Sequence, residues 1–178
     1  AEDFDKAVHD LIKQYATEHQ RIIFNGNGYS DAWVEEAERR GLPNIKSMVD
    51  AIPSLTTDKA VKLFEKFHVF TKAELESRAE IKYENYAKAI NIEAKTMIDM
   101  ASKQIIPAII KYTKELADTV NAVKAAGADA SVQAELLNEI SGLLAETKKA
   151  LSHLIEVTEE AGAMEEGRDQ AVFYHDVV

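Results

Sequence analysis

The side chains that most often carry chemistry are few in this sequence, and they rarely stand at the spacing that a site needs. No histidine stands four residues from another; the five are His9, His19, His68, His153 and His175. A dinuclear metal site in a helical bundle needs a Glu-x-x-His motif on each of two helices, and only Glu65 with His68 fits. Glu18-His19 and Glu35-Glu36 have no second set of ligands at helical spacing. We therefore expect no metal site in this chain.

Nucleophiles at a recognisable spacing are also missing. The sequence contains no cysteine, which excludes a disulfide framework, a thiolate zinc site and a cysteine nucleophile. Ser30, Ser47 and Ser77 stand outside any Gly-x-Ser-x-Gly elbow, so an acyl-transfer triad has no support. The expectation is that no catalytic residue lies in these 178 residues.

One local sequence could bind a cofactor: Asn25, Gly26, Asn27, Gly28 and Ser30, with Tyr29 between the last two. Both Asn-Gly pairs form turns and tolerate positive φ, and two glycines ahead of a helix N-terminus can form an anion-binding nest. The segment matches neither G-x-G-x-x-G nor G-x-x-x-x-G-K-[ST]. The other interpretation is a double turn that lets Tyr29 and Trp33 pack against a neighbour, and the residue types favour it.

The charge distribution excludes several classes of partner. The formal net charge is −10, and residues 132–178 hold 10 acidic against 3 basic side chains. No basic stripe is available to neutralise phosphates, so we expect no nucleic-acid partner. An acidic membrane surface would repel the C-terminal segment. The sequence contains no run of 18 apolar residues, which is the length that a membrane-spanning helix needs. We therefore expect no membrane partner, and no charged-then-apolar leader opens the chain.

The elements that must position these side chains are helices. Glycine and proline are scarce over long stretches, and apolar residues recur three and four positions apart, which predicts an all-α fold. The first helix is expected over Asp3–His19, with an apolar stripe made by Phe4, Val8, Leu11, Ile12 and Tyr15. Residues 21–24 break this period and predict an extended segment or a short strand.

Three shorter helices are expected before residue 70, each with a cap or a breaker at its ends. They are Ser30 or Asp31 to Gly41, Ile45–Ala51 ending before Pro53, and Thr57 to about His68.

A very long helix follows. Thr71 and Glu74 form a capping box, and no breaker appears until Pro107. Helical spacing continues through this proline, so one helix is expected over Lys72–Ala125, kinked near Pro107 because its ring blocks an i−4 hydrogen bond. The apolar positions expected to keep the helical spacing are Leu75, Ile90, Ala94, Met97, Ala101, Ile105, Tyr112, Leu116, Val120 and Val123. The remaining Met100, Tyr83 and Tyr86 are expected to make core or interface contacts.

A second long helix is expected to return along the first. It begins after a turn at Gly127, with Asp129 or Ser131 as its N-cap. Its apolar seam consists of Leu137, Ile140, Leu144, Thr147, Leu151, Leu154 and Thr158. This spacing suits an antiparallel partner, so residues 86–162 are expected to form a helical hairpin. The fold class is thus all-α: short helices, then a long kinked helix that forms an antiparallel hairpin.

Three segments are expected from this organisation. Residues 1–70 form a short-helix segment with the Asn-Gly-Asn-Gly loop, residues 71–162 the long hairpin, and residues 163–178 the start of a truncated C-terminal segment. Both ends of the sequence fall within helical patterns, and no methionine opens it, so we expect a piece of a larger protein.

Several long strings in the chain resemble the C-terminal region of type III glutamine synthetases. These strings are residues 21–30 with Trp33, residues 36–38 and 40–44, residues 63–66 and 69–71, Ser77-Arg78 with Glu80-Ile81, residues 84–86, 90–94 and 96–100, Pro107-Ala108, and residues 165–168 with 174–176. The resemblance is weakest at the hairpin tip. Phe67-His68 stands where a more turn-prone pair is expected, and Ala79 replaces an aromatic residue.

The resemblance implies an ATP-dependent ligase that phosphorylates the γ-carboxylate of glutamate and lets ammonia displace the phosphate. It implies ATP and Mg²⁺ or Mn²⁺ for the parent enzyme, a cytoplasmic location, an upstream catalytic domain in the same chain, and a homo-oligomer of two stacked hexameric rings. No catalytic residue carries over onto this sequence, and no cofactor is expected within the fragment. The alternative is a stand-alone helical module that binds a partner through the hairpin.

Overall fold

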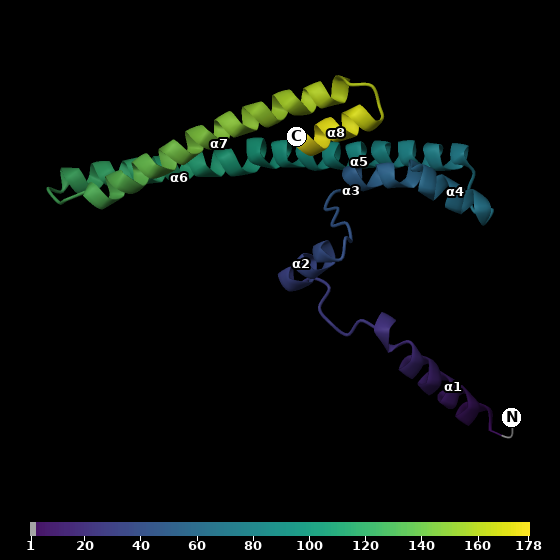
Figure 1. Cartoon of the computed structure of the whole chain (residues 1–178). Helices are drawn as coiled ribbons and strands as arrows, with labels where there is room; N and C mark the ends of the chain where they lie inside the picture. The colour runs from purple at the N-terminus through teal and green to yellow at the C-terminus, as the bar shows by residue number, and fades with distance from the viewer. Residues whose placement is uncertain (1–2) are drawn as a thin grey trace. The chain divides into compact units, whose positions relative to one another are not determined.

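A computed structural model describes residues 3–178, in which no β-strand forms (Figure 1). The all-α prediction is therefore confirmed. The chain divides into two compact units, one ending at Ile45 and the other spanning Lys46–Val178. Within residues 3–178, no helix is both long enough and apolar enough to cross a bilayer. The domain limits expected near residues 70 and 162 stay predictions.

The first unit contains α1 (Phe4–Glu18), a 3₁₀ turn (Gln20–Ile22) and α2 (Asp31–Arg39). The side chain of Asp3 caps α1 by accepting a hydrogen bond from the Lys6 backbone N–H at 3.0 Å. The predicted limits of α1 are thus confirmed. At residues 21–24 the 3₁₀ turn ends and Ile23 is extended (φ −86°, ψ 117°), so the extended alternative fits only the second half of this run.

The first unit has almost no core of its own. Ala37 is its single buried residue among those described. The whole apolar stripe of α1 is exposed: Phe4 at 74%, with Val8, Leu11, Ile12 and Tyr15 also open to solvent. Because burial of apolar surface is the main stabilising term in folding, this unit needs another surface to cover it.

The second unit is organised by one continuous helical rod of 54 residues, about 80 Å long. It consists of α5 (Lys72–Met100), a π turn (Ala101–Ile105) and α6 (Ile106–Ala125). Its start is the predicted capping box, in which the Glu74 backbone N–H donates to the Thr71 hydroxyl at 3.3 Å and the Thr71 N–H donates to the Glu74 carboxylate at 2.7 Å. Both limits of the predicted long helix are confirmed.

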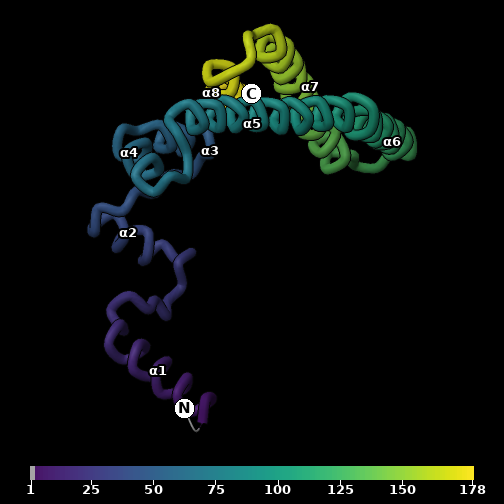
Figure 2. Tube along the Cα trace, turned by 90° about the vertical axis from the view of Figure 1, so that its right-hand side faces the viewer, coloured from purple at the N-terminus to yellow at the C-terminus, as the bar shows by residue number. Residues whose placement is uncertain are grey.

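The returning arm of the hairpin is α7 (Ser131–Ala163), which packs along α6 and α5 (Figure 2). Gly127 makes the turn with φ +75°. Neither expected N-cap occupies that position, because Ala130 is the N-cap and lacks a side-chain acceptor. Asp129 still satisfies the Ser131 backbone N–H, at 2.9 Å.

Every predicted seam residue of α7, from Leu137 to Thr158, is buried or half-buried. The facing side of the rod is less regular. Apart from Ala117, its buried and half-buried positions from residue 94 onward step by three or four residues except once, from Ala101 to Ile106, where they step by five: Ala94, Ile98, Ala101, Ile106, Ile109, Thr113, Leu116, Val120 and Val123. The step of five coincides with the π turn, whose wider winding holds one more residue than an α turn.

Part of the predicted stripe is wrong, and the π turn explains the error at Ile105. Met97, Ile105 and Tyr112 were expected on the packed face, yet they are exposed at 61%, 48% and 46%. In an uninterrupted α-helix the inward-facing residue after Ala101 would be Ile105. With the π turn it is Ile106. Pro107 cannot donate a backbone hydrogen bond, and the chain accommodates it with this π turn immediately before it.

The core of the second unit lies at the other end of the rod, where α8 (Arg168–Asp176) packs against α5, α7 and α3 (Met48–Ala51) (Figure 1). Ala171 is fully buried there, between Ile52, Ala79 and Tyr83. The amide of Gln170 donates to the Ala161 carbonyl at 3.0 Å and so caps the C-terminus of α7. The last segment of the chain thus contains a helix that packs tightly against the base of the hairpin.

The short helix expected over Ile45–Ala51 ends at Ala51, before Pro53, as expected, but it begins at Met48. A 3₁₀ turn (Ile52–Thr56) continues directly from α3 and places Pro53 in its first turn, where a missing N–H costs nothing. Next, α4 (Asp58–Lys66) begins at the predicted cap, with the Thr57 hydroxyl accepting from the Ala60 N–H at 3.3 Å.

Candidate functional site

The Asn25–Ser30 segment forms a compact turn that leads into α2. The Asn27 side chain accepts a hydrogen bond from the Tyr29 N–H at 2.9 Å, and its carbonyl accepts from the Ser30 hydroxyl at 3.0 Å. Ser30 then caps α2 by accepting from the Trp33 N–H at 3.3 Å. Three polar donors that could have met an anion therefore already have acceptors within the segment.

The two glycines serve a purpose different from the expected one, because neither has a positive φ. At Gly26 a Cβ atom would lie 2.7 Å from the Phe24 ring, so only glycine lets this ring lie against the backbone. The Phe24 ring in turn packs on Trp33, with centroids 4.6 Å apart. At Gly28 a Cβ atom would lie 4.0 Å from the nearest Phe24 atom, which is an ordinary contact.

The aromatic contact supports the packing-turn interpretation for Trp33. Tyr29, which was expected to pack as well, is 99% exposed. The turn thus presents one tyrosine ring fully to solvent while it fixes Phe24 against α2.

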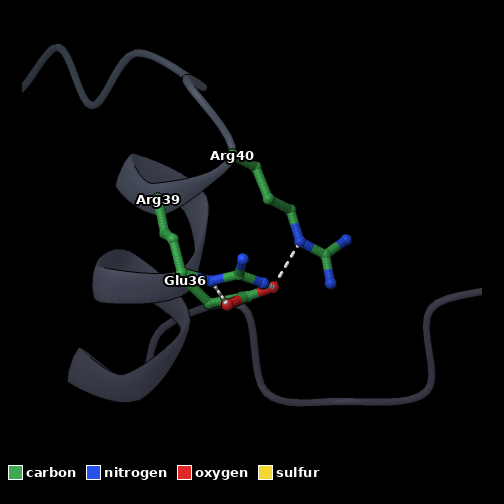
Figure 3. Close-up of polar contacts among 3 residues, drawn as sticks. All are labelled: Glu36, Arg39 and Arg40. Carbon is green, nitrogen blue, oxygen red and sulfur yellow. Dashed lines mark hydrogen bonds and ion pairs between the residues drawn. The ribbon is translucent and has the colours of Figure 1, made fainter.

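An ionic cluster follows on α2 (Figure 3). The Arg39 Nε and Nη2 atoms donate to the two Glu36 carboxylate oxygens, each at 2.6 Å, and Arg40 Nε donates to Glu36 Oε1. These arginine hydrogen bonds lower the pKa of Glu36 from 4.5 to about 2. The Arg40 guanidinium also lies 5.8 Å from the Trp33 ring centroid. Both arginines are therefore paired with Glu36, whose single carboxylate balances one of their two charges.

The Glu65 and His68 pair lies at the end of α4, where both residues border a shallow hollow with Thr71 and Glu74. His68 holds a left-handed backbone (φ +54°) that ends the helix. Its N–H donates to the Glu65 carbonyl at 3.0 Å, and the Val69 N–H donates to the Phe64 carbonyl at 3.0 Å, which is a Schellman motif. Across residues 3–178 no three acidic, histidine or cysteine side chains gather as a metal site would require.

Sequence reasoning missed one charged hollow, of about 400 Å³, where α4, α5 and α8 meet. Lys72, Glu76, Glu80 and Arg168 border it, and Lys72 pairs with Glu76 at 3.6 Å. Tyr83 closes it, and burial raises the pKa of that phenol. No sequence signal could have found it, because Arg168 stands almost a hundred residues from the others. Asp58 also borders the hollow, and its three acids and two bases favour neither an anionic nor a cationic ligand.

Comparison with known proteins gives a consistent result. The family described as the glutamine synthetase C-terminal domain matches residues 7–124 of the chain. A glutamine synthetase of Butyrivibrio fibrisolvens is 37% identical over 179 residues, which cover 99% of this chain and 26% of that protein. A type-3 glutamine synthetase of Dictyostelium discoideum is 39% identical over 117 residues, covering 66% of this chain and 16% of that protein.

A third relative, a glutamine synthetase of Bacteroides fragilis (strain YCH46), is 27% identical over 180 residues, or 98% of this chain and 25% of that protein. The chain thus spans about a quarter of the length of the relatives that it matches end to end.

Proposed function

The chain belongs to the glutamine synthetase C-terminal domain family, and we propose that it serves as a non-catalytic helical part of a type III glutamine synthetase. The observation that carries this proposal is the 37% identity over 99% of the chain to a glutamine synthetase about four times longer. In this proposal the remaining three quarters of such an enzyme hold the catalytic residues, and the present chain supplies structural support.

The proposed parent enzyme transfers the γ-phosphoryl group of ATP to the γ-carboxylate of glutamate, and ammonia then displaces phosphate to give glutamine. Mg²⁺ or Mn²⁺ would neutralise charge on the phosphoryl group there. The described residues of this chain offer little to that chemistry: the Tyr29 N–H, the Ser30 hydroxyl and the Trp33 N–H at the Asn25–Ser30 turn have acceptors within it, and both arginines of α2 are paired with Glu36. We therefore assign no step of the reaction to this chain, and we place the enzyme in the cytoplasm with its ATP supply.

Each of the three sequence segments has a proposed role in the parent enzyme. Residues 1–70 contact the upstream catalytic part, because the apolar stripe of α1 has no cover within its own unit. Residues 71–162, the hairpin, reach other subunits of a double hexameric ring. Residues 163–178 lock the base of the hairpin, where Ala171 is fully buried.

Assay of the isolated chain separates a structural role from a catalytic one. We expect no ATP- and Mg²⁺-dependent glutamine formation and no γ-glutamyl transfer from the 178-residue chain, whereas the full-length parent enzyme turns over. Turnover by the isolated chain, abolished by chelation of Mg²⁺, would overturn the non-catalytic assignment.

A matched pair of substitutions tests the proposed contact of α1. Leu11→Lys in the full-length enzyme places a charge in the exposed apolar stripe, and we expect it to lower activity and assembly together. Thr17→Lys introduces the same side chain on the opposite helical face and should leave both unchanged. Equal effects of the two variants would contradict the proposed contact.

The Asn25–Ser30 turn can be tested separately for a nucleotide contact. Gly28→Ala suits this test better than Gly26→Ala, since a Cβ at residue 26 would collide with the Phe24 ring. If the turn only packs, the ATP concentration for half-maximal rate stays unchanged in Gly28→Ala. A several-fold rise without unfolding would instead assign Asn25, Gly26, Asn27, Gly28 and Ser30 to the nucleotide site.

The alternative of a stand-alone interaction module makes a different prediction about the gene. A start codon directly before Ala1 and a stop codon directly after Val178 would favour the module. An open frame that continues upstream into an acidic metal-binding domain would favour the enzyme.

A further inference from the structure

The Asn25–Ser30 turn contains the same dipeptide twice, as Asn25-Gly26 and Asn27-Gly28. An asparagine followed by glycine can lose ammonia without an enzyme, because glycine has no Cβ to keep the asparagine side chain away from its backbone nitrogen. All four residues are exposed to solvent. The dipeptide alone does not distinguish the two asparagines, so a difference between them has to come from the folded turn.

The reaction is a ring closure followed by hydrolysis. The glycine nitrogen attacks the asparagine Cγ and forms a new N–C bond, while an oxyanion develops on Oδ1. The Cγ–Nδ2 bond then breaks, and Nδ2 leaves as ammonia with the proton that the glycine nitrogen gives up. Water opens the resulting succinimide at one of its two carbonyls, which leaves aspartate or isoaspartate. The only co-reactant is therefore water.

The folded turn places Asn27 favourably for this ring closure. Its Oδ1 accepts a hydrogen bond from the Tyr29 N–H at 2.9 Å, which is an Asx turn. The ring that this hydrogen bond closes contains both reacting atoms, Cγ of Asn27 and the nitrogen of Gly28, and such proximity favours reaction. The same N–H donates to the oxygen on which the oxyanion develops, so it stabilises the transition state.

The attacking nitrogen of Gly28 is also unobstructed. Within residues 3–178 no hydrogen bond uses its N–H, and a Cβ atom there would meet nothing closer than 4.0 Å.

Asn25 lacks these advantages. In the described part of the chain its side chain accepts no hydrogen bond, in contrast to Asn27. The Phe24 ring lies so close to Gly26 that a Cβ atom there would be 2.7 Å from it, and this ring packs on Trp33 with centroids 4.6 Å apart. Ring closure at Asn25 would therefore disturb a packed backbone.

We propose that Asn27 is a site of spontaneous deamidation in this protein, and that the Tyr29 N–H makes it react faster than Asn25. The reaction lies outside the proposed function and does not rest on it, because every interaction that favours it lies within residues 24–33. Failure of the glutamine synthetase assignment leaves it unaffected.

The two products have opposite effects on the start of α2. Aspartate keeps the backbone at residue 27, so its carbonyl still accepts from the Ser30 hydroxyl at 3.0 Å. Its new negative charge precedes the N-terminus of α2, where the helix dipole favours it. Isoaspartate instead routes the main chain through Cγ, and the former backbone carbonyl becomes part of the side-chain carboxylate. That change breaks the turn that positions Ser30 as the cap of α2.

Peptide mapping measures both rates in one sample. The 178-residue chain is kept at neutral pH and digested with trypsin, and the peptide of residues 22–39 holds both asparagines. Fragment ions in mass spectrometry then assign each new acid to residue 25 or 27. We expect Asn27 to react about two- to tenfold faster than Asn25, which is the value of one exposed hydrogen bond.

The same measurement in urea is the control for folding, and there the ratio of the two rates should fall toward one. Equal rates in the native chain, or a faster Asn25, would overturn the proposal. An equally large ratio in urea would overturn the structural origin of the preference.

Substitutions at residue 29 separate its N–H from its ring, which is 99% exposed. Tyr29→Pro removes the donor and should lower the Asn27 rate to that of Asn25, whereas Tyr29→Ala retains the donor and should leave the preference unchanged. A preference that persists in Tyr29→Pro, or disappears in Tyr29→Ala, would contradict the role of the N–H.

A variant at residue 28 tests the ring closure without the backbone change that proline brings. Gly28→Ala places a Cβ beside the attacking nitrogen and should slow Asn27 but not Asn25. An unslowed Asn27 in this variant would contradict attack by the residue 28 nitrogen. An isoaspartate-specific methyltransferase provides an independent readout, because it should label the aged parent chain more strongly than aged Gly28→Ala.

Discussion

At the scale of single residues, the charged side chains of α2 that could bind a ligand form ion pairs with one another. Glu36 accepts from both Arg39 and Arg40, and Arg40 also lies beside the Trp33 ring. An exposed ion pair of this kind contributes little stability by itself. Its effect here is to hold both arginines beside one carboxylate, which balances one of their two charges.

The lowered pKa of Glu36 predicts how this cluster responds to acid. The folded value of about 2 lies below the unfolded value of 4.5, so the contribution is fully present above pH 4.5 and is lost as the pH falls through 2. Carboxyl NMR titration should give a midpoint near 2 for Glu36. Arg39→Gln should move that midpoint upward toward 4.5, and an unchanged midpoint would contradict the arginine origin of the shift.

His68 predicts a gain in stability at a helix end. Its left-handed backbone (φ +54°) costs a non-glycine residue about 1–2 kcal/mol, and glycine would add about 0.4–1 kcal/mol of unfolded-chain entropy. We therefore expect His68→Gly to raise the free energy of unfolding by about 0.5–1 kcal/mol in urea titrations. Gly127→Ala, at φ +75°, should lower it; the same sign for both variants would contradict the Schellman explanation.

At the scale of elements, the π turn of the rod decides which face packs. Before it the seam runs through Ala94 and Ala101, and after it the seam continues at Ile106. In an uninterrupted α-helix one inserted residue rotates everything beyond it by about 100°, whereas the π turn accommodates one extra residue without that rotation. The turn thus keeps both halves of the rod in register with α7.

Removal of one residue within the π turn should therefore be tolerated. Deletion of Lys103 together with Pro107→Ala turns the step of five into a step of four and leaves an unbroken α-helix. We expect its thermal midpoint to stay within a few degrees of the parent. Deletion of Lys111 with the same Pro107→Ala change should lower the midpoint by on the order of 10 °C, because each lost kcal/mol shifts it by about 2–4 °C.

Equal losses from the two deletions would show that the π turn does not set the register. Circular dichroism during heating, read at the helix minimum, measures both midpoints, and the Pro107→Ala variant alone serves as the reference.

At the scale of the whole molecule, burial is unevenly distributed between the two units. The first unit buries Ala37 alone among its described residues, whereas the second holds the clusters around Tyr83 and Tyr174. An isolated helix of 15 residues is marginal in water. Stability in the isolated chain therefore resides in the hairpin base, where α8 joins α5 and α7.

Hydrogen exchange should show this difference directly. In the isolated chain, amides of α1 should be slowed by no more than about tenfold, whereas amides of α5 near Tyr83 should follow the global unfolding of the second unit. In the full-length enzyme α1 should gain protection if its stripe contacts the catalytic part. Strong protection of α1 in the isolated chain would contradict the role proposed for the stripe.

Much of this architecture follows from local sequence. The caps at Asp3, Thr57 and Thr71 depend on hydrogen bonds within three residues, and the limits of the 54-residue rod follow from them and from Gly127. The seam of α7 was predictable for the same reason, because it has an unbroken helical period. The candidate turn at Asn25–Ser30 was also recognisable, although its chemistry was not.

Other features were decided only by the tertiary structure. They depend on contacts between residues distant in the chain, or on backbone conformations with similar local energies. The π turn before Pro107 made Ile106 the inward residue and left Ile105 exposed, although a regular α period from Ala101 places Ile105 inside. The reason for Gly26 appeared only when the Phe24 ring lay over it, and the charged hollow formed only when Arg168 returned to α5. Local hydrogen bonds determine where helices begin and end, while packing between distant segments determines which faces they bury and which they leave for other molecules.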